Sequence, residues 1–339
     1  MKPTDFSYYL TGFLTKYLLN ERGASSNTID SYRDTFILFL VFARDRKGTQ
    51  ANCLTLSDIT KDMIVEYLDW IEIDRNCSAA TRNVRLAAMH SFFQYLQYQN
   101  PDNLLEWQRI LAIPVKKTSK QSFSYLTLDG IKLLLAMPDQ NKKTGRRDLA
   151  LISLMYDTGA RVQEVIDLTP LSIRFDNPYT IKLIGKGNKA RIVPLMKPTV
   201  ALLRNYMEEQ GLLRRSSNHY PLFCNKQKER LTRAGVNYIL AKYADMARNE
   251  NSVLIPKSLS CHCLRHSKAM HLLQAGVNLV YIRDILGHCS VQTTEIYAKV
   301  DSKQKREAIE KAYTDVTPSE IPAWQQSEDL LAWLKDFNH

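Results

Sequence analysis

Six side chains of types that can act on a phosphodiester stand in five short segments of the chain. They are Arg161, Lys186, His262 with Arg265, His288, and Tyr297, and the first segment also contains Glu164. Attack on a phosphodiester adds negative charge to oxygens that are already anionic, and a pair of guanidiniums can hold that charge through paired hydrogen bonds. A tyrosine could attack if its proton, with an ordinary pKa near 10, were removed as the new bond forms. Each segment alone is a weak signal, so the prediction depends on their order and spacing.

The order of these residues resembles the tyrosine recombinase, or phage integrase, family. The family pattern is an arginine, a lysine on a hairpin, His-x-x-Arg, a histidine or tryptophan, and a tyrosine about nine residues later. In this chain the pattern runs from Arg161 to Tyr297. The likeness covers roughly residues 126 to 313 and, more loosely, the N-terminal region, as in Xer-like members with two domains. It implies a fold that is mainly α with a small β-sheet.

The resemblance also implies a role for each matching residue. Arg161 and Arg265 would clamp the scissile phosphate, and Tyr297 would be the nucleophile. The rest of the set comprises the further catalytic residues Lys186, His262 and His288 and the bracing residue Glu164. The implied reaction cuts and rejoins DNA strands through a 3'-phosphotyrosyl intermediate and a Holliday junction.

Two protons must move in such a reaction. We expect His262 to take the phenolic proton. The 5'-oxygen of DNA is a poor leaving group and needs a proton, which Lys186 on a hairpin turn could deliver, with Lys189 on the same turn as the alternative. Because a phosphotyrosyl ester is similar in energy to the broken bond, resealing requires neither ATP nor metal. The sequence has no Gly-x4-Gly-Lys-Ser/Thr loop and no evident carboxylate cluster for magnesium, so we expect no cofactor.

A zinc site is an alternative for the histidines. His262 and His266 have the i, i+4 spacing of a helical zinc pair, and Cys261 and Cys263 flank the first histidine. The metalloprotease arrangement requires Glu after the first histidine, where this chain has Cys263, and no third ligand is marked. We therefore predict no metal site and interpret His266 as a histidine that belongs to the core or supports the site. The six cysteines show no Cys-x2-Cys spacing, which indicates reduced thiols.

Hydrophobic periodicity divides the chain into domains. Apolar residues at three- and four-residue spacing predict helices over 6–20, 26–45, 57–74 and 78–98. We expect residues 1–112 to form an N-terminal helical domain. The resemblance implies that this domain is the SAM-like core-binding domain, which binds DNA. Residues 113–125 mix Pro, Ser and Lys and predict a basic linker. Residues 126–313 are expected to be the α/β catalytic domain.

Within 126–313, helices are predicted over 128–137 and 147–158, and a β-hairpin over 179–184 and 190–195. Gly276 and Gly287 follow helical segments at positions where a left-handed residue ends a helix. Residues 314–339 form an acidic tail with apolar residues at mostly helical spacing, including Trp324, Leu331 and Leu334. The tail could pack on its own domain or be exchanged between protomers.

Charge is concentrated in one part of the chain. The formal net charge is +11, and residues 113–313 hold 33 Lys and Arg against 17 Asp and Glu. A segment this basic favours an anionic partner, although ordinary surface charge is the simpler interpretation. We predict DNA contacts at Arg82, Arg85, Lys116 and Lys117, the first two forming one basic helix face. The sequence shows neither a membrane-span pattern nor a secretory signal, which predicts a cytoplasmic, nucleoid-associated protein.

Several functions remain open at this point. The resemblance implies a homotetramer on two double-stranded DNA sites, which integrates, excises or transposes a mobile element. Resolution of replicon dimers by a Xer-type recombinase is one alternative. A type IB topoisomerase shares the active-site chemistry but relaxes supercoils as a monomer. A DNA-binding regulator without activity would not need the complete set of catalytic residue types.

Overall fold

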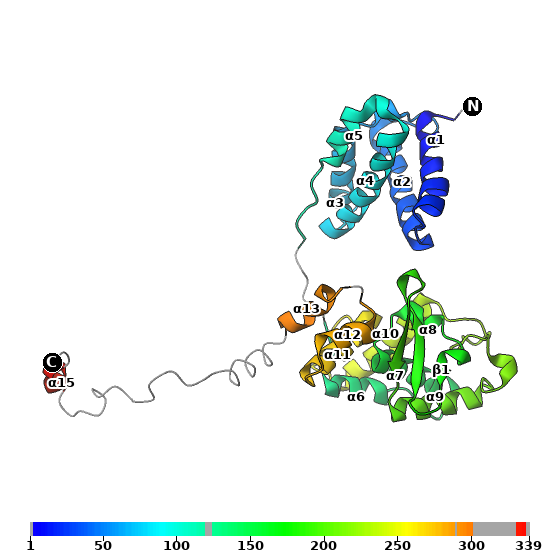
Figure 1. The fold of residues 1–339 in the computed structure, drawn as a ribbon, viewed down its shortest axis with the longest axis vertical. Helices are drawn as coiled ribbons and strands as arrows, with labels where there is room; N and C mark the ends of the chain where they lie inside the picture. Colours follow the sequence, from blue (N-terminus) through cyan, green and yellow to red (C-terminus); the bar gives the residue numbers. More distant parts are fainter. Residues whose placement is uncertain (1–2, 119–123, 289, 301–329, 337–339) are drawn as a thin grey trace. The chain divides into compact units, whose positions relative to one another are not determined.

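The computed structural model of the chain describes residues 3–118, 124–288, 290–300 and 330–336. It contains two compact units, Met1–Ser122 and Phe123–His339. Both units are mainly helical, and the second also contains a small sheet (Figure 1). The predicted fold class is therefore confirmed. The domain limits and the linker at 113–125 stay predictions.

The first unit is a helical bundle. Its elements are α1 (Asp5–Gly12), the π-helical η1 (Phe13–Glu21), α2 (Ser26–Lys47), η2 (Leu56–Asp58), α3 (Lys61–Ile73), α4 (Ala79–Gln99), η3 (Pro101–Asn103) and α5 (Leu104–Leu111). Helices α2, α3 and α4 begin where Ser25, Thr60 and Ser78 accept hydrogen bonds from backbone N–H groups three residues later. Each of the four predicted ranges contains a helix, and α5 is an additional one.

Aromatic side chains form the core of this bundle. Phe13 and Phe36 each contact Phe92 edge to face, with ring centroids 5.3 and 5.1 Å apart, an arrangement that aromatic quadrupoles favour. Helix α5 adds Trp107, which is fully buried, lies against Phe93 and donates its indole N–H to a backbone carbonyl. The bundle thus has a complete core within the first unit.

The sheet of the second unit has three antiparallel strands in the order β1 (Ile173–Arg174), β2 (Thr180–Ile184) and β3 (Ala190–Pro194). Strands β2 and β3 form the predicted hairpin. Ile181, Leu183 and Val193 are buried and alternate with exposed residues, as expected of a sheet with one face on the core. The turn between the strands, η5 (Lys186–Asn188), is closed by a 2.8 Å hydrogen bond from the Gly185 N–H to the Lys189 carbonyl.

The sheet lies within a mainly helical unit. Its helices are α6 (Leu128–Ala136), α7 (Lys143–Thr158), α8 (Val162–Ile166), α9 (Lys197–Glu209), α10 (Arg233–Glu250), α11 (Cys261–Gln274), α12 (Leu279–Leu286) and α13 (Gln292–Val300), with the short segments η4 (Pro170–Ser172) and η6 (Arg215–Ser217). A further helix, α15 (Leu330–Asp336), lies near the end of the chain. Helix α7 is almost entirely buried and contacts both α9 and α11, so it is the centre of the unit. The unit has its own apolar core.

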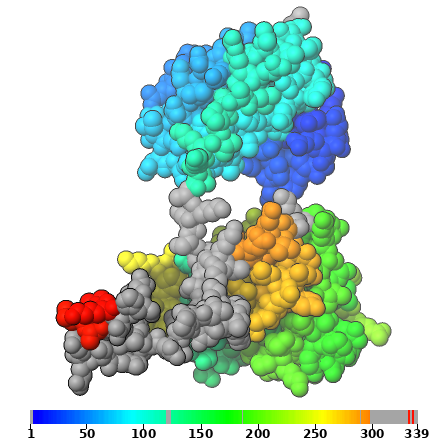
Figure 2. Space-filling model, turned by 60° about the vertical axis from the view of Figure 1, so that its left-hand side comes forward, coloured from blue at the N-terminus to red at the C-terminus, as the bar shows by residue number. Residues whose placement is uncertain are grey.

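The helices that carry the predicted site residues lie together. Helix α11 contacts α7, α12 and α13, and α12 contacts β3. On the face shown in Figure 2, the yellow-to-orange residues of this region lie beside green residues of the second unit. The packing therefore brings segments far apart in the sequence to one place. Among the described residues, no helix combines the length and apolar character needed to cross a membrane.

Candidate active site

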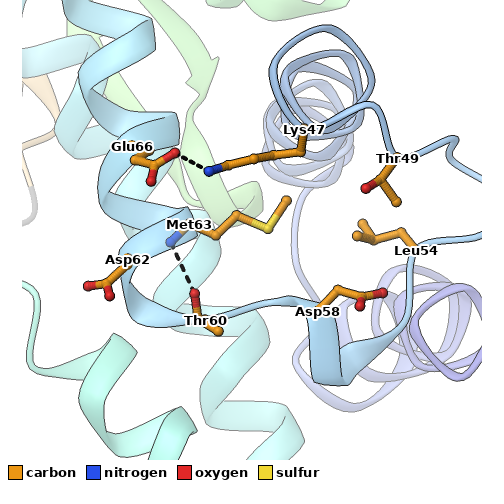
Figure 3. Close-up of a pocket in the computed structure, with 8 residues that line it drawn as sticks. All are labelled: Lys47, Thr49, Leu54, Asp58, Thr60, Asp62, Met63 and Glu66. Atoms are coloured by element: carbon orange, nitrogen blue, oxygen red, sulfur yellow. Dashed lines mark hydrogen bonds and ion pairs between the residues drawn. The ribbon is translucent and has the colours of Figure 1, made fainter.

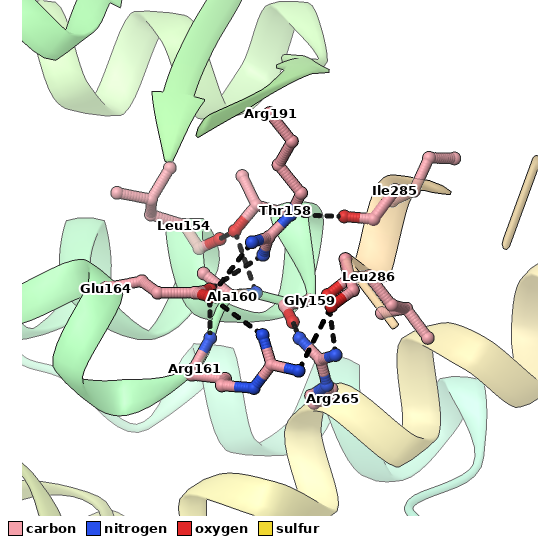
Figure 4. Close-up of polar contacts among 11 residues, drawn as sticks. Leu154, Thr158, Gly159, Ala160, Arg161, Glu164, Arg191, Arg265, Ile285 and Leu286 are labelled. Atoms are coloured by element: carbon pink, nitrogen blue, oxygen red, sulfur yellow. Dashed lines mark hydrogen bonds and ion pairs between the residues drawn. The ribbon is translucent and has the colours of Figure 1, made fainter. Parts of the chain in front are cut away.

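Two helix ends meet at the centre of the candidate site. Helices α7 and α12 both end at glycines, Gly159 with φ 59° and Gly287 with φ 66°, a left-handed conformation that glycine adopts without steric cost. The carbonyls at these ends accept hydrogen bonds from Arg265 of α11: Nη1 donates to the Gly159 oxygen at 2.7 Å and Nη2 to the Leu286 oxygen at 2.6 Å (Figure 4). Arg265 thereby fixes three helices relative to one another.

Arg161 lies next to this junction. It is the N-cap residue of α8, and its Nη2 donates to the Gly287 carbonyl at 3.2 Å while Nη1 contacts Glu164 Oε1 at 2.9 Å. Two predicted phosphate clamps, Arg161 and Arg265, thus bind adjacent carbonyls at the end of α12 (Figure 4). The side chain of Arg161 is 34% exposed. Arg265 is buried, with 4% of the whole residue exposed.

Glu164 is a buried carboxylate held between two arginines. Besides Arg161, it binds Arg191 of β3 through two hydrogen bonds of 2.9 and 2.7 Å. Burial alone would raise the pKa of Glu164, but the hydrogen bonds and charges of Arg191 and Arg161 outweigh it and hold the pKa below its ordinary value. Glu164 is therefore an anion that braces the site.

Arg191 was not predicted as a site residue. Besides its two bonds to Glu164, its Nε donates to the Ile285 carbonyl at 2.8 Å. Sequence alternation could have found it, because Arg191 stands two residues before buried Val193 and so shares the inner face of β3. A charged residue at an inward position of a strand needs a partner, and here that partner is Glu164.

Tyr297 is buried on α13 with 1% of its surface exposed. Its hydroxyl lies 2.9 Å from Nδ1 of His266, and its ring stacks near that of His288 with centroids 6.4 Å apart. Burial raises the pKa of Tyr297, while the charges of Arg265 and Arg161 act in the opposite direction. The phenol is therefore protonated at neutral pH and lies within electrostatic reach of both arginines.

The three histidines around Tyr297 favour the neutral form. Burial, followed by the charge of Arg265, lowers the pKa of His288 to about 4. Burial, followed by His262, lowers the pKa of His266 to about 4. His262 is more exposed, yet burial of its ring and the two arginines also lower its pKa. Neutral imidazoles can accept protons at pH 7, which suits the role predicted for His262.

Individual contacts fix these histidines. The Nδ1 atom of His288 lies 2.9 Å from the Thr294 hydroxyl, and the His262 and His266 rings lie 6.3 Å apart, roughly parallel. Lys186 occupies the first position of η5 on the hairpin turn, and its side chain lies outside the part of the chain that the structure describes. Among described residues, no group of three His, Cys, Asp or Glu side chains could hold a metal ion.

The residues predicted to contact DNA in the first unit have different surroundings. Arg82 is 4% exposed, pairs with Glu72 at 3.4 Å and lies 3.4 Å from the Pro114 carbonyl. Arg85 is half-buried and binds the Ser31 carbonyl and the Thr35 hydroxyl. The alternative of a solvated surface does not fit these two residues, because their guanidiniums bind groups of the first unit. Their contact with DNA stays a prediction.

Lys116 and Lys117 are exposed. Lys116 forms an ion pair with Glu72 and so shares this carboxylate with Arg82. Lys117 is the more available of the two for an anionic partner.

A pocket elsewhere in the first unit contains none of the predicted residues. It lies between the end of α2 and the start of α3 (Figure 3), and its lining residues are Lys47, Thr49, Leu54, Asp58, Thr60, Asp62, Met63 and Glu66. Lys47 and Glu66 form an ion pair across it. The remaining carboxylates would repel a phosphate, so this pocket does not fit the predicted chemistry.

Of the predicted tail, the structure describes α15. Leu331 and Leu334 are 64% and 56% exposed, so α15 presents apolar side chains to solvent. Trp324 and the rest of residues 314–329 lie outside the described part of the chain.

Comparison with known proteins agrees with this geometry. Residues 124–304 match the model of the phage integrase family, and residues 11–100 match the phage integrase N-terminal SAM-like domain. The chain is 37% identical to the "Putative integrase/recombinase y4rC" of Sinorhizobium fredii over 98% of both chains. It is 33% identical to the tyrosine recombinase XerD of Listeria monocytogenes, over 84% of this chain and 91% of the relative.

Solved structures are also similar. The XerH site-specific recombinase bound to a palindromic difH substrate is 26% identical, with a TM-score of 0.66 over 88% of this chain and 83% of that one. The Tn1549 transposon integrase in complex with DNA shares the fold at 15% identity, with a TM-score of 0.67 over 92% and 100% of the two chains. The chain belongs to the phage integrase family: it is a tyrosine recombinase, an enzyme that cleaves and rejoins DNA strands.

Proposed function

We propose that this chain is a site-specific recombinase that exchanges DNA strands through a covalent 3'-phosphotyrosyl link to Tyr297. One observation carries the proposal. Two consecutive residues of α11 contact the parts of the proposed site. Arg265, the proposed clamp, binds the ends of α7 and α12, and His266 contacts the hydroxyl of Tyr297, the proposed nucleophile. Because Arg265 and His266 are adjacent on α11, this one helix positions both the Arg265 guanidinium and the Tyr297 hydroxyl oxygen.

The charges of the site suit a phosphate diester. Arg161 and Arg265 each use two of the five N–H donors of a guanidinium in the contacts described above, so both can also donate to phosphate oxygens. Burial lowers the pKa of Arg265 to about 10, with Arg161 as the second cause, which still leaves it charged at neutral pH. Preorganised donors of this kind stabilise the extra negative charge of a pentacoordinate phosphorus.

The proposed cleavage forms one bond to phosphorus and breaks another. The Tyr297 oxygen attacks phosphorus, the P–O bond to tyrosine forms, and the bond from phosphorus to the 5'-oxygen breaks. The phenolic proton passes to His262, and Lys186 gives a proton to the departing oxygen, which leaves as a 5'-hydroxyl. Reversal by the 5'-hydroxyl of another strand reseals the DNA and frees Tyr297. Lys189, on the same turn, is the alternative proton donor.

The proposed biological reaction is integration, excision or transposition of a mobile element through a Holliday junction. The integrase/recombinase relative aligns along nearly the whole chain, which supports this choice. Similarity to XerD supports resolution of replicon dimers as the second candidate. In either case we infer a homotetramer on two duplex sites, acting in the cytoplasm on the nucleoid, with residues 314–339 docking into a neighbouring protomer.

A plasmid assay separates these functions from DNA relaxation. Genomic DNA that flanks the gene and binds the protein is placed as two copies on one plasmid. We expect deletion or inversion between the copies and loss of this product in a chain lacking residues 314–339, which still cleaves single sites. Relaxation of plasmids without the sites, by a monomer, would instead identify a topoisomerase and overturn the proposal.

A further inference from the structure

Arg191 connects three parts of the second unit that the proposed reaction uses. It stands on β3 opposite Leu183, five residues after Lys186. Its Nη1 and Nη2 bind the two oxygens of Glu164 on α8, and its Nε binds the Ile285 carbonyl near the end of α12. These contacts run from the hairpin to both neighbouring elements (Figure 4).

The fit around Arg191 is close. A Cβ atom added to Gly287 would lie 2.8 Å from Arg191 Nη1 and 3.0 Å from its Cδ, and a Cβ on Gly185 would lie 3.1 Å from Glu164 Oε1. Arg191 therefore packs against glycine backbone at the end of α12, and its carboxylate partner packs against the start of the hairpin turn. Such packing restricts movement of the turn end of the hairpin relative to Arg161 and His288.

Arg191 differs from the two proposed phosphate clamps in the partner that its guanidinium binds. Both of its terminal nitrogens bind a single buried carboxylate, and its side chain is only 11% exposed, against 34% for Arg161. The bidentate pair with Glu164 directs both terminal nitrogens of Arg191 toward the protein. We therefore expect Arg191 to contribute to the reaction through the elements that it connects.

We propose that Arg191 is a positioning residue that fixes the β2–β3 hairpin so that the turn delivers the proton of Lys186 to the departing 5'-oxygen. This inference rests on the proposed function. Lys186 stands at the start of the turn, next to Gly185, whose N–H closes the turn on Lys189. Removing Arg191 frees the strand that anchors one side of this turn, while Arg161 and Arg265 keep their carbonyl contacts with α12.

A DNA substrate with sulfur in place of the bridging 5'-oxygen tests directly whether Arg191 acts through proton delivery. A thiol has a pKa near 8.5, far below that of water or an alkanol, so a thiolate leaves without receiving a proton. A defect in proton delivery therefore disappears on a 5'-bridging phosphorothiolate, and a defect in phosphate binding or in the nucleophile does not. The readout is the rate at which the covalent adduct forms on each DNA under single-turnover conditions.

For Arg191→Gln we expect the rate on ordinary DNA to fall on the order of 100-fold, as for a displaced catalytic group, and the rate on the phosphorothiolate to stay within about threefold of the parent. Lys186→Ala should show the same pattern. Arg191→Lys, which keeps one charge opposite Glu164, should recover part of the rate. Should Arg191→Gln fail to fold, Arg191→Lys is compared on the two substrates instead.

Arg146→Gln is the matched control. Arg146 binds both oxygens of Glu209, at 2.9 and 2.6 Å, at the opposite end of α7 from Gly159, so the variant breaks an equivalent pair away from the site. It should cleave both substrates at the parental rate. An Arg191→Gln variant slowed equally on both substrates would overturn the positioning role. Failure of the parent chain itself to form any Tyr297-dependent adduct would instead overturn the proposed function.

Discussion

The hydroxyl of Tyr297 lies 2.9 Å from Nδ1 of His266, the residue that follows Arg265 on α11. A neutral His266 whose ring proton is on Nε2 accepts a hydrogen bond from the phenolic O–H at Nδ1. The contact holds the reactive oxygen of α13 at the helix that also carries the buried arginine. The proposed nucleophile therefore contacts the helix that carries the proposed clamp Arg265.

His266→Phe should therefore slow adduct formation while leaving noncovalent DNA binding unchanged. A single hydrogen bond contributes about 0.5–1.5 kcal/mol, so the rate should fall about 2- to 10-fold. His266→Asn, which keeps an acceptor, should recover part of it. The measurement is the single-turnover rate on a nicked site; an unaltered rate in His266→Phe would show that the contact does not prepare Tyr297 for attack.

Replacing the two arginines proposed to clamp the phosphate should affect the cleavage rate and the stability of the fold differently. Arg161→Met and Arg265→Met should each lower the cleavage rate by on the order of 100- to 1000-fold. Arg265→Met should destabilise the fold more than Arg161→Met. The carbonyls of Gly159 and Leu286 lose their Arg265 donors at a cost of about 1–3 kcal/mol for each unsatisfied group. Arg161→Met removes the donor of one carbonyl, and Glu164 keeps its bonds to Arg191. Thermal unfolding of both variants checks this. Equal stability losses would contradict the assigned contacts.

Acid should destabilise the second unit through its neutral histidines. Burial is the main cause that lowers the pKa of His266 and His288 to about 4, whereas an unfolded histidine has a pKa near 6.5. Between these values the unfolded chain binds more protons, so their stabilisation is complete above about pH 6.5 and is lost as the pH falls toward 4. The Tm of the parent should therefore fall from about pH 7 to about pH 4.5.

The double variant His266→Phe/His288→Phe provides the comparison, since other acidic groups titrate in both proteins. It should show a shallower fall in Tm over this range. Identical pH profiles for the two proteins would show that these histidines do not carry the effect.

DNA binding should distinguish Lys117 from Arg82. Lys117 is exposed, so Lys117→Ala should weaken DNA binding and lower the slope of log K against log salt concentration by about 1 if it contacts a phosphate. Arg82 is buried against Glu72 and Pro114, so Arg82→Ala should mainly lower the Tm of the first unit. A reduced salt slope in Arg82→Ala at unchanged Tm would restore the basic face predicted from the sequence.

Local sequence signals were sufficient for most of the fold. The hairpin alternates apolar and polar residues, and α3 and α4 begin at a threonine and a serine that cap them, so both kinds of element follow from short-range rules. Helix α5 was missed because it is short and its N-cap residue, Asn103, makes no side-chain capping bond. Helix α5 is stabilised by the burial of Trp107 in the core, which is a tertiary contact that short-range rules do not predict.

The site was predictable as a set of residue types, and less so as a set of contacts. The order of Arg161, Arg265 and Tyr297 identified the chemistry, but Arg191 reaches a carbonyl 94 positions away and its role depends on packing. The spacing of Arg82 and Arg85 suggested a surface, since periodicity shows which residues share a helix face without showing what covers that face.

The central claim is that Tyr297 becomes linked to DNA. The most direct measurement incubates the parent chain with a nicked site, from which the short fragment that carries the new 5'-hydroxyl is lost after cleavage. The product is digested, and the modified residue is located by mass spectrometry. We predict a nucleotide on Tyr297 in the parent and no adduct with Tyr297→Phe. An adduct on another residue, or an undiminished yield from Tyr297→Phe, would contradict the account.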